Sequence, residues 1–564
     1  MLDVALVHAP SVYDFRNRDD LLFAYLGNSD SVHVSPIFEM PPSGLLAIQQ
    51  YLSARGKTVV FYNIASHMLR DDTFDVEAFF ARLETRLLGI DLHWLAHAQG
   101  ALELAAIYKR LHPEGKVYLG GISASYFHTE VIRYPQIDYV IRGVDTLQAV
   151  EQLIDSENEE EKLLRIPGLT WMRAGVPVEN EMGRDAGTYT VCIDWKPVFE
   201  GKEGRITPYN MVIPQVGCRY DCRWCGGSRY AGRKHLGQAD AVYKSAAALV
   251  NELNSILASG SRRHTVTMIN YWHENDELLE AVHDAFCSDR IDRVHVSVRS
   301  LPDPSRFAKL EWGKKLVVEL SPDSQRMDVS RNCGHGHYTM EEMERFINAL
   351  LGCVHSFEIY FMIGIPGQAR EDVRETVKFC GQLLQRYEGK RVIPFICPML
   401  PFLDPGSLFF DRAEKFGYRI LRKSFEEHRT ALLCMHWGDR LNYETRWMSR
   451  RELVDITYEA VRELTLLKAK YRIIPAGVCD GIVGLIGRTQ DMLARIDCYQ
   501  AMPDSPEKEN VGCGLRGDIL EYNREQLSRV RSQQRPLDLG FTRLQWFDTE
   551  EAFAAFEGRE THLC

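Results

Sequence analysis

Residues 216–227 read Val-Gly-Cys-Arg-Tyr-Asp-Cys-Arg-Trp-Cys-Gly-Gly, and this stretch decides the predicted fold. It brings three cysteines, Cys218, Cys222 and Cys225, into one short loop whose glycines allow the backbone to turn closely. Thiolates crowded in this way can bind one iron–sulfur cluster, and a cluster of four irons requires four ligands. Because the loop offers three, one iron would stay open to a substrate or a cofactor, which indicates a chemically reactive cluster.

Two other interpretations of the cysteines are a structural zinc knuckle and three unrelated thiols of the core. Structural zinc is usually bound by four ligands in a tetrahedron. The nearest further candidate is His235, ten residues after Cys225. Zinc is therefore the weaker interpretation of this loop.

The C-x3-C-x2-C spacing, with Trp224 directly before the third cysteine, resembles the signature of the radical S-adenosylmethionine (SAM) enzymes. The resemblance implies that Cys218, Cys222 and Cys225 hold a 4Fe–4S cluster and thereby carry the catalysis. In that family the open iron chelates the methionine part of SAM and reduces it to a 5′-deoxyadenosyl radical. Trp224 is expected to pack near the adenine of SAM.

Length and charge limit the classes of protein that fit this chain. With 564 residues it is too long for one core and should divide into about three domains. Its 67 basic and 78 acidic residues give a net charge of −11, which disfavours nucleic acid as a partner. The N-terminus resembles a buried strand and not a signal peptide, and no apolar stretch is long enough for a membrane span. Fourteen irregularly spaced cysteines suit a reducing compartment, so we expect a cytoplasmic protein without disulfides.

Residues 1–150 are predicted to form a doubly wound, Rossmann-like parallel sheet. Short apolar runs alternate there with segments of helical period, such as 44–55 and 98–111. The ligand of such a sheet lies across the loops at the carboxyl ends of its strands. The expected strands are 4–8, 58–64, 87–92, 116–119 and 139–141.

The residues at these strand ends indicate a large ligand. Paired glycines followed by small hydroxyl residues let a ligand lie close to the backbone. Alone, this pattern suits any flavodoxin-like or nucleotide-binding sheet. Before a radical SAM motif, its Pro-Pro-x-Gly, Gly-Gly and Arg-Gly-x-Asp segments resemble the cobalamin-binding domain of the cobalamin-dependent radical SAM family. The resemblance implies that cobalamin is bound by His8, Pro42, Gly44, His93, Gly120, Gly121 and Ser123.

The cobalt-ligating motif of many cobalamin proteins, Asp-x-His-x-x-Gly, is missing from its usual place after the first strand. Asp91-Leu92-His93 matches half of it, but follows the third strand and has Ala96 where glycine is expected. We therefore expect His8 and His93 to line the pocket, and the cobalt to lack a histidine ligand.

Residues 151–204 are predicted to be a linker with a small hairpin formed by 166–171 and 188–193. Residues 205–410 again alternate strands and helices, and six such units predict a partial (β/α)6 barrel with its chemistry at the strand ends. Residues 411–564 are predicted to be a mainly helical region that caps the barrel and contacts substrate. The expected barrel strands are 210–215, 265–270, 293–298, 315–320, 356–363 and 392–397.

Further segments resemble the SAM-binding parts of the radical SAM family. Met-Ile-Gly-Ile-Pro-Gly-Gln at 362–368 implies adenine contacts by Gly364, Ile365 and Gly367. Glu319, Ser321 and Asp323 offer acceptors for the ribose hydroxyls and polar groups for the SAM carboxylate. Where the family often has Gly-Gly-Glu for the SAM amino group, this chain has Asn270 and Glu274.

Cys333 lies near His335 and His337, but one thiol is poor support for a second metal, which we do not expect there.

The resemblance implies a cobalamin-dependent radical SAM methyltransferase. It would methylate an unactivated atom of a small molecule or peptide precursor by means of the 5′-deoxyadenosyl radical and methylcobalamin, with electrons from a donor such as a flavodoxin or ferredoxin. One alternative is an enzyme with the same cofactors that catalyses a rearrangement, a cyclisation or an oxidation. A tRNA methylthiotransferase and a non-catalytic cobalamin sensor are the less favoured alternatives.

Overall fold

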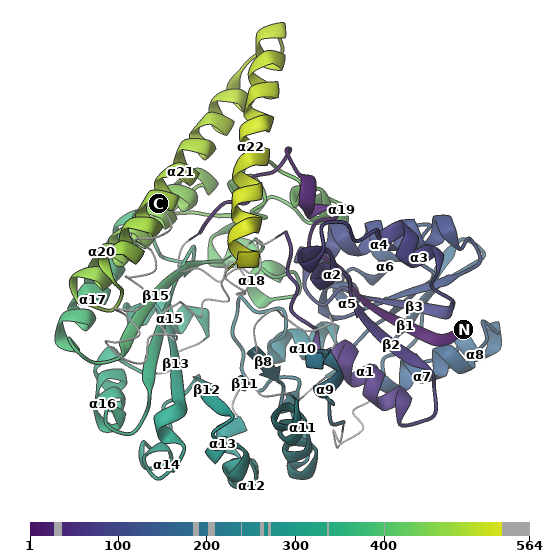
Figure 1. Ribbon diagram of the computed structural model, residues 1–564, viewed down its shortest axis with the longest axis horizontal. Helices are drawn as coiled ribbons and strands as arrows, with labels where there is room; N and C mark the ends of the chain where they lie inside the picture. The colour runs from purple at the N-terminus through teal and green to yellow at the C-terminus, as the bar shows by residue number, and fades with distance from the viewer. Residues whose placement is uncertain are drawn as a thin grey trace.

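The structure is a computed structural model that describes residues 1–26, 36–183, 191–200, 209–238, 240–259, 264–268, 272–334, 338–399 and 401–532. Figure 1 shows two α/β units side by side, with long helices rising above them. The chain passes from the first unit through the second and ends in the helices, so the three parts follow the order of the sequence.

The first unit is built on a seven-stranded sheet of order β2-β1-β3-β4-β5-β6-β7. Its first five strands pair in parallel, as predicted. Alternate residues of β1 pack into two different cores, Val4 and Leu6 on one face and Ala5 and Val7 on the other. Both faces are therefore covered by helices, which explains why these strands are continuously apolar. The strands are β1 (Leu2–His8), β2 (Val59–Asn63), β3 (Thr85–Asp91), β4 (Lys116–Gly120) and β5 (Tyr139–Ile141).

The hairpin predicted as part of a linker extends this sheet instead of bridging two domains. Its strands are β6 (Leu169–Arg173) and β7 (Val176–Glu179), and β6 pairs antiparallel with β5. Pairing on β5 supplies partners for backbone groups of that edge and buries Trp171. The expected second arm at 188–193 is not a strand in its described part, and residues 188–190 lie outside the described residues.

The second unit is a parallel six-stranded sheet of order β15-β14-β13-β12-β11-β8, as expected for a partial barrel. One face packs under the helices that connect the strands, including α11 (Ala246–Ala258), α16 (Met340–Leu350) and α17 (Arg370–Arg386). The strands are β8 (Tyr209–Val212), β11 (His264–Met268), β12 (Ile291–Val298), β13 (Leu316–Asp323), β14 (Ser356–Ile363) and β15 (Val392–Pro398).

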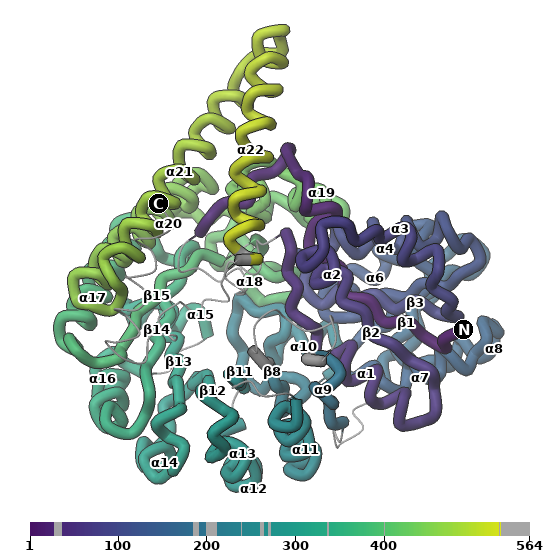
Figure 2. The backbone as a smooth tube through the Cα atoms, in the orientation of Figure 1, coloured from purple at the N-terminus to yellow at the C-terminus, as the bar shows by residue number. Residues whose placement is uncertain are grey.

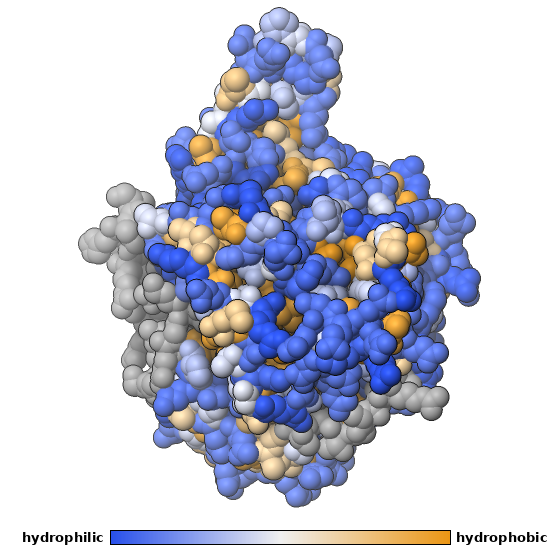
Figure 3. Space-filling model, turned by 90° about the vertical axis from the view of Figure 1, so that its right-hand side faces the viewer, coloured by the Kyte–Doolittle hydropathy of each residue, from blue (hydrophilic) through white to orange (hydrophobic). Residues whose placement is uncertain are grey.

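The C-terminal helical region packs back against the first unit. Helix α20 (Arg450–Lys470) packs on α17, and α21 (Ala476–Ala501) and α22 (Pro506–Ser532) form the long projection of Figure 1. Figure 2 shows α22 descending beside the segment that follows β1. The face of the molecule shown in Figure 3 is mainly hydrophilic. No helix among the described residues combines the length and the apolar character needed to cross a membrane.

The contact between α22 and the N-terminal segment depends on Asn523, which is buried. Its amide donates to the carbonyls of Arg18 (2.9 Å) and Leu21 (2.8 Å) and accepts from the Phe23 amide (2.9 Å). We expect Asn523→Ala to lower the free energy of unfolding by about 2–4 kcal/mol, because three buried main-chain groups lose their partner. Denaturant titration would measure the loss, with Arg524→Ala, at an exposed position of the same helix, as the control. Equal stability of the two variants would contradict this role.

Candidate cofactor sites

The cysteine loop follows β9 (Gln215–Val216), after the first barrel strand, at the carboxyl edge of the sheet. Cys218, Cys222 and Cys225 form no disulfide among the described residues. The Tyr220 amide donates to Cys218 Sγ (3.5 Å) and the Gly227 amide to Cys225 Sγ (3.3 Å). Hydrogen bonds to sulfur tune the potential of iron–sulfur clusters, so the backbone is already arranged for this ligand set.

The loop is held on two sides. The Gly226 amide donates to Asp404 Oδ2 (2.9 Å), and a Cβ on Gly226 would lie 3.2 Å from the Cβ of Asp404, so this position favours glycine. Arg223 binds the main chain of Asn332 and Cys333 at the end of α15 (Met327–Cys333). The sequence motif did not reveal Asp404, because it lies 178 residues away.

The geometry argues against zinc at the triad. Burial raises the pKa of the Cys218 and Cys225 thiols, so they need a bound cation to become thiolates. Among the described residues, two sets of potential metal ligands lie within 4.8 Å of one another, and the triad is not one of them. A wider spacing suits a cluster better than one ion. His235, the nearest further candidate for a zinc ligand, is bound to Asp411 (2.9 Å).

The segment after β14 is the predicted adenine site. Gly364 and Gly367 have positive φ angles (+89° and +84°), and Ile365 is fully buried. The buried amide of Gln368 accepts from the Gly364 amide (2.9 Å), and Tyr418 donates to the Gly364 carbonyl (2.9 Å). The turn is thus held from both sides, and Gln368 and Tyr418 are bracing residues that the motif alone did not indicate.

The predicted ribose and carboxylate site lies along β13. Asp323 is buried with φ +62°, at a register shift where the strand ends. Glu319 lies further back on the strand, with a carboxylate oxygen 3.6 Å from His295 Nδ1. Ser321 lies between them. The assignment of these residues to SAM remains a prediction.

Two further residues were predicted to contact SAM at the barrel mouth. Trp224 is partly buried against the large core, and Asn270 lies outside the described residues. The neighbouring Glu274 accepts from the Tyr220 hydroxyl (2.9 Å) and pairs with Arg219, so it braces the cysteine loop.

At the carboxyl edge of the first sheet, His93, Gly120, Gly121 and Ser123 of the loops after β3 and β4 form one surface, which we call the floor. Gly121 has φ +114°, and a Cβ there would lie 2.6 Å from the backbone of His93. The hydroxyl of Ser123 donates to the His93 carbonyl (3.1 Å). These contacts join the loops after β3 and β4 and keep Gly120 and Gly121 at the surface of the site. Pro42 precedes α1 (Ser43–Ser53), where Gly44 has open space around it. An open floor of this kind fits a flat, bulky ligand.

His8 is held too firmly to bind cobalt. Its Nδ1 lies 2.9 Å from Asp91 Oδ1 and its Nε2 lies 2.8 Å from the Phe38 carbonyl. Burial disfavours the charged form of both side chains, but the attraction between them outweighs burial. The pKa of His8 is therefore raised and the pKa of Asp91 is lowered. Both ring nitrogens are therefore engaged as donors, and neither lone pair is free.

His93 is less constrained. Burial lowers its pKa, which keeps the imidazole neutral, and its ring lies edge-on against Trp94 (4.7 Å between centroids).

We expect the cob(II)alamin state of the protein to lack a histidine ligand. In its electron paramagnetic resonance spectrum, His8→Ala and His93→Ala should leave the cobalt hyperfine pattern and any nitrogen splitting unchanged. A triplet that disappears in His93→Ala would contradict this expectation and identify His93 as the ligand.

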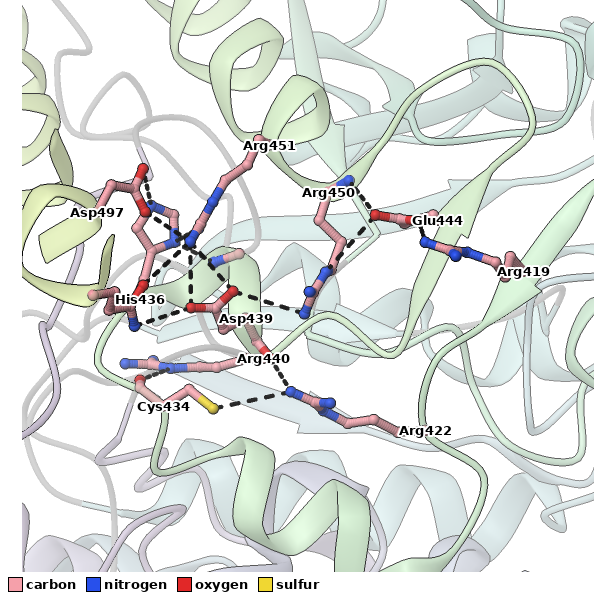
Figure 4. Close-up of polar contacts among 12 residues, drawn as sticks. Arg419, Arg422, Cys434, His436, Asp439, Arg440, Glu444, Arg450, Arg451 and Asp497 are labelled. Carbon is pink, nitrogen blue, oxygen red and sulfur yellow. Dashed lines mark hydrogen bonds and ion pairs between the residues drawn. The ribbon is translucent and has the colours of Figure 1, made fainter. Parts of the chain in front are cut away.

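The helical cap contains an arginine-rich network, drawn in Figure 4. Asp439 pairs with Arg450 and Arg451. Arg440 is buried, and its guanidinium donates to the carbonyls of Cys434 (3.1 Å) and Leu22 (3.0 Å), so it ties the cap to the N-terminal segment. Burial lowers the pKa of Arg440 to about 10.

Asn442 and Tyr443 of the cap hold the backbone of the segment that follows β15. Asn442 makes two hydrogen bonds with the Leu403 backbone, and Tyr443 donates to the Met399 carbonyl (3.0 Å).

Comparison with known proteins agrees with the two sites. The B12 binding domain family matches residues 32–151, and the Radical SAM superfamily matches residues 212–380. A B12-binding domain followed by a radical SAM domain defines an enzyme that uses both cofactors. The chain belongs to the cobalamin-dependent radical SAM enzymes, and its cofactors are a 4Fe–4S cluster, SAM and cobalamin.

Solved structures share the fold over most of the chain. The radical SAM methyltransferase TsrM from Kitasatospora setae, with cobalamin and an iron–sulfur cluster bound, has a TM-score of 0.57 and 15% identity, covering 93% of this chain and 99% of that one. The cobalamin-dependent radical enzyme OxsB, with aqua-cobalamin and SAM bound, has a TM-score of 0.52 and 11% identity, covering 94% and 75%.

Two curated relatives are also similar. An uncharacterized methyltransferase of Pyrococcus horikoshii is 23% identical over 366 residues, 61% of this chain and 73% of that protein. An anaerobic magnesium-protoporphyrin IX monomethyl ester cyclase of Synechocystis is 24% identical over 262 residues, 45% of this chain and 49% of that protein.

Proposed function

We propose that this enzyme transfers the methyl group of SAM to an unactivated atom of a small molecule or peptide. The proposal rests on the contact between the two cofactor sites. A Cβ on Gly227, in the cysteine loop, would lie 3.5 Å from the Ile122 side chain, which directly follows the Gly120-Gly121 floor. The cysteine loop and the floor therefore adjoin, and a substrate between them would reach both cofactors.

When bound, the cluster and SAM supply a radical that removes a hydrogen atom, and cobalamin supplies a transferable methyl group. The chain's own contribution is to position the cofactors and to exclude water. Arg440 and Asn523 join the cap to the N-terminal segment, and a closed assembly of this kind protects reactive species from solvent. The methyltransferase relatives support methyl transfer.

The substrate and the electron donor belong to the same proposal. The net charge of −11 favours a small molecule or a peptide over nucleic acid. A flavodoxin or ferredoxin is the proposed source of the electron that the cluster requires.

The proposal is tested by supplying the reduced enzyme with trideuteromethyl-labelled SAM and an extract of small molecules and peptides from its host. One compound should gain a trideuteromethyl group as 5′-deoxyadenosine accumulates. Formation of 5′-deoxyadenosine with no labelled compound would contradict methyl transfer.

The second candidate is a cyclisation, rearrangement or oxidation with the same cofactors. The relative named as a cyclase favours it. It predicts 5′-deoxyadenosine without S-adenosylhomocysteine, because no SAM would be used as a methyl donor.

A further inference from the structure

Three titratable side chains gather on the inner face of the barrel sheet, apart from the cysteine loop. They are His295 on β12, Glu319 on β13 and Glu358 on β14, which are neighbouring strands. Glu319 and Glu358 stand directly opposite each other in the register. Because side chains alternate along a strand, these residues face away from the helices, whereas the residues flanking them pack into the core beneath the helices. The flanking residues are Val294, Val296, Val318, Leu320, Phe357 and Ile359.

The spacing of these side chains suits a metal ion. One ligand atom from each residue lies within 4.8 Å of the others. The 3.6 Å between His295 Nδ1 and Glu319 Oε1 is too long for a hydrogen bond, but suits two ligands bound to one ion at about 2.0–2.2 Å each. His295 and Glu358 are fully buried, and the side chain of Glu319 is 16% exposed.

Glu358 is oriented by a neighbour on its own strand. The Tyr360 hydroxyl donates to Glu358 Oε2 (2.8 Å), which holds the carboxylate in place on the strand. Outer contacts of this kind fix the direction of a metal-binding carboxylate.

Two buried hydroxyls next to the group give a second, independent indication of a ligand. Thr267 stands opposite His295 on β11, and Ser297 stands opposite Glu319 on β12. Thr267 Oγ1 and Ser297 Oγ are shielded from solvent and have no hydrogen-bond partner among the described residues. The two residues are 4% and 6% exposed. Since a buried polar group without a partner is costly, a polar ligand at this place would satisfy them.

We propose that His295, Glu319 and Glu358 bind one divalent transition-metal ion inside the barrel, and that Thr267 and Ser297 hydrogen-bond to the water that completes its coordination. One nitrogen and two carboxylate ligands suit Zn²⁺, Mn²⁺ or Fe²⁺ better than Mg²⁺ or Ca²⁺. As a metal ligand, Glu319 would not make the contact with the SAM ribose that the sequence predicts, and the ion would adjoin the remaining predicted SAM residues, because Glu319 precedes Ser321 by two residues on β13. The metal site is additional to the cluster and does not depend on the proposed methyl transfer.

Binding of Mn²⁺ by the anaerobic holoenzyme tests the site, because Mn²⁺ is distinct from the iron of the cluster and the cobalt of cobalamin. The spectrum of free Mn²⁺ during a titration gives the number of bound ions and their dissociation constant, and Zn²⁺ is measured by competition with a coloured chelator. All proteins carry Cys287→Ser, which disables a second group at the surface formed by His283, Cys287 and Glu311.

We expect one bound ion per chain, and at least about tenfold weaker binding in Glu319→Gln and in Glu358→Gln. Glu311→Gln, in the surface group, should bind the ion as the parent does. Cluster absorbance and cobalamin content of the same samples report folding, and Glu319→Gln, at the more accessible position, keeps the test valid if Glu358→Gln misfolds. The proposal is overturned if neither ion binds, or if both variants bind as tightly as the parent. Because no turnover is measured, failure here is distinct from failure of the proposed function.

Discussion

Replacing Cys225 with alanine should reduce 5′-deoxyadenosine formation to background. With two thiolates left, the loop no longer offers the three ligands that leave one iron open to SAM. Anaerobic reconstitution should yield little iron and sulfide per chain, and the cluster absorbance should be lost. Cobalamin binding should persist, because the floor at Gly120 and Gly121 does not depend on Cys225. Product formation is measured by chromatography after addition of SAM and a strong reductant.

Cys333 provides the matched control for this experiment. Its thiol is fully buried beside the cysteine loop, and its carbonyl accepts from the Arg223 amide. Cys333→Ala should retain the cluster and SAM cleavage, apart from a modest loss of stability. A Cys225→Ala protein that still cleaves SAM, or a Cys333→Ala protein that is folded and loses its cluster, would refute the assignment of the triad.

The second large effect is expected at Gly121, where alanine should strongly weaken the retention of cobalamin. The residue has φ +114°, and the added methyl group would lie 2.6 Å from the His93 backbone. A backbone conformation that is almost exclusive to glycine costs another residue about 1–3 kcal/mol, and displacement of the floor adds to this. Since 1.4 kcal/mol corresponds to tenfold, we expect cobalamin affinity to fall at least about tenfold. SAM cleavage should continue while methyl transfer is lost.

Gly175→Ala is the control for Gly121→Ala, because it introduces a side chain at a positive φ without a steric clash. Gly175 has φ +80° in the turn between β6 and β7, and a Cβ there meets no atom within 4 Å. It therefore also has a positive φ, in the same sheet, without the clash. Equal cobalamin content in the two variants, measured by absorbance after gel filtration, would remove Gly121 from the floor.

The local pattern of apolar residues was sufficient to predict much of the fold. Continuous apolar runs predicted β1 to β5, and the helical segments expected at 44–55 and 98–111 agree with α1 and α4 (Ala98–Leu111). The hairpin was placed wrongly because a polar two-stranded ribbon gives no local sign of the edge it pairs with.

The parts of the sites that sequence could not supply are contacts between distant residues. The sequence reveals the cluster ligands Cys218, Cys222 and Cys225, because all three lie in one loop. His8 and Asp91 are 83 residues apart, so their pairing, which removes His8 as a cobalt ligand, appears in three dimensions alone. The gathering of His295, Glu319 and Glu358 likewise depends on the strand register, which no spacing along the chain encodes.

The central claim is that one chain brings SAM to both a cluster and cobalamin for methyl transfer. The most direct test gives the purified, reduced holoenzyme SAM with a trideuterated methyl group, and follows the label by mass spectrometry without any added substrate. The account predicts that label appears on the protein-bound cobalamin, that S-adenosylhomocysteine is released in equal amount, and that 5′-deoxyadenosine forms slowly. Formation of 5′-deoxyadenosine with unlabelled cobalamin and no S-adenosylhomocysteine would contradict methyl transfer.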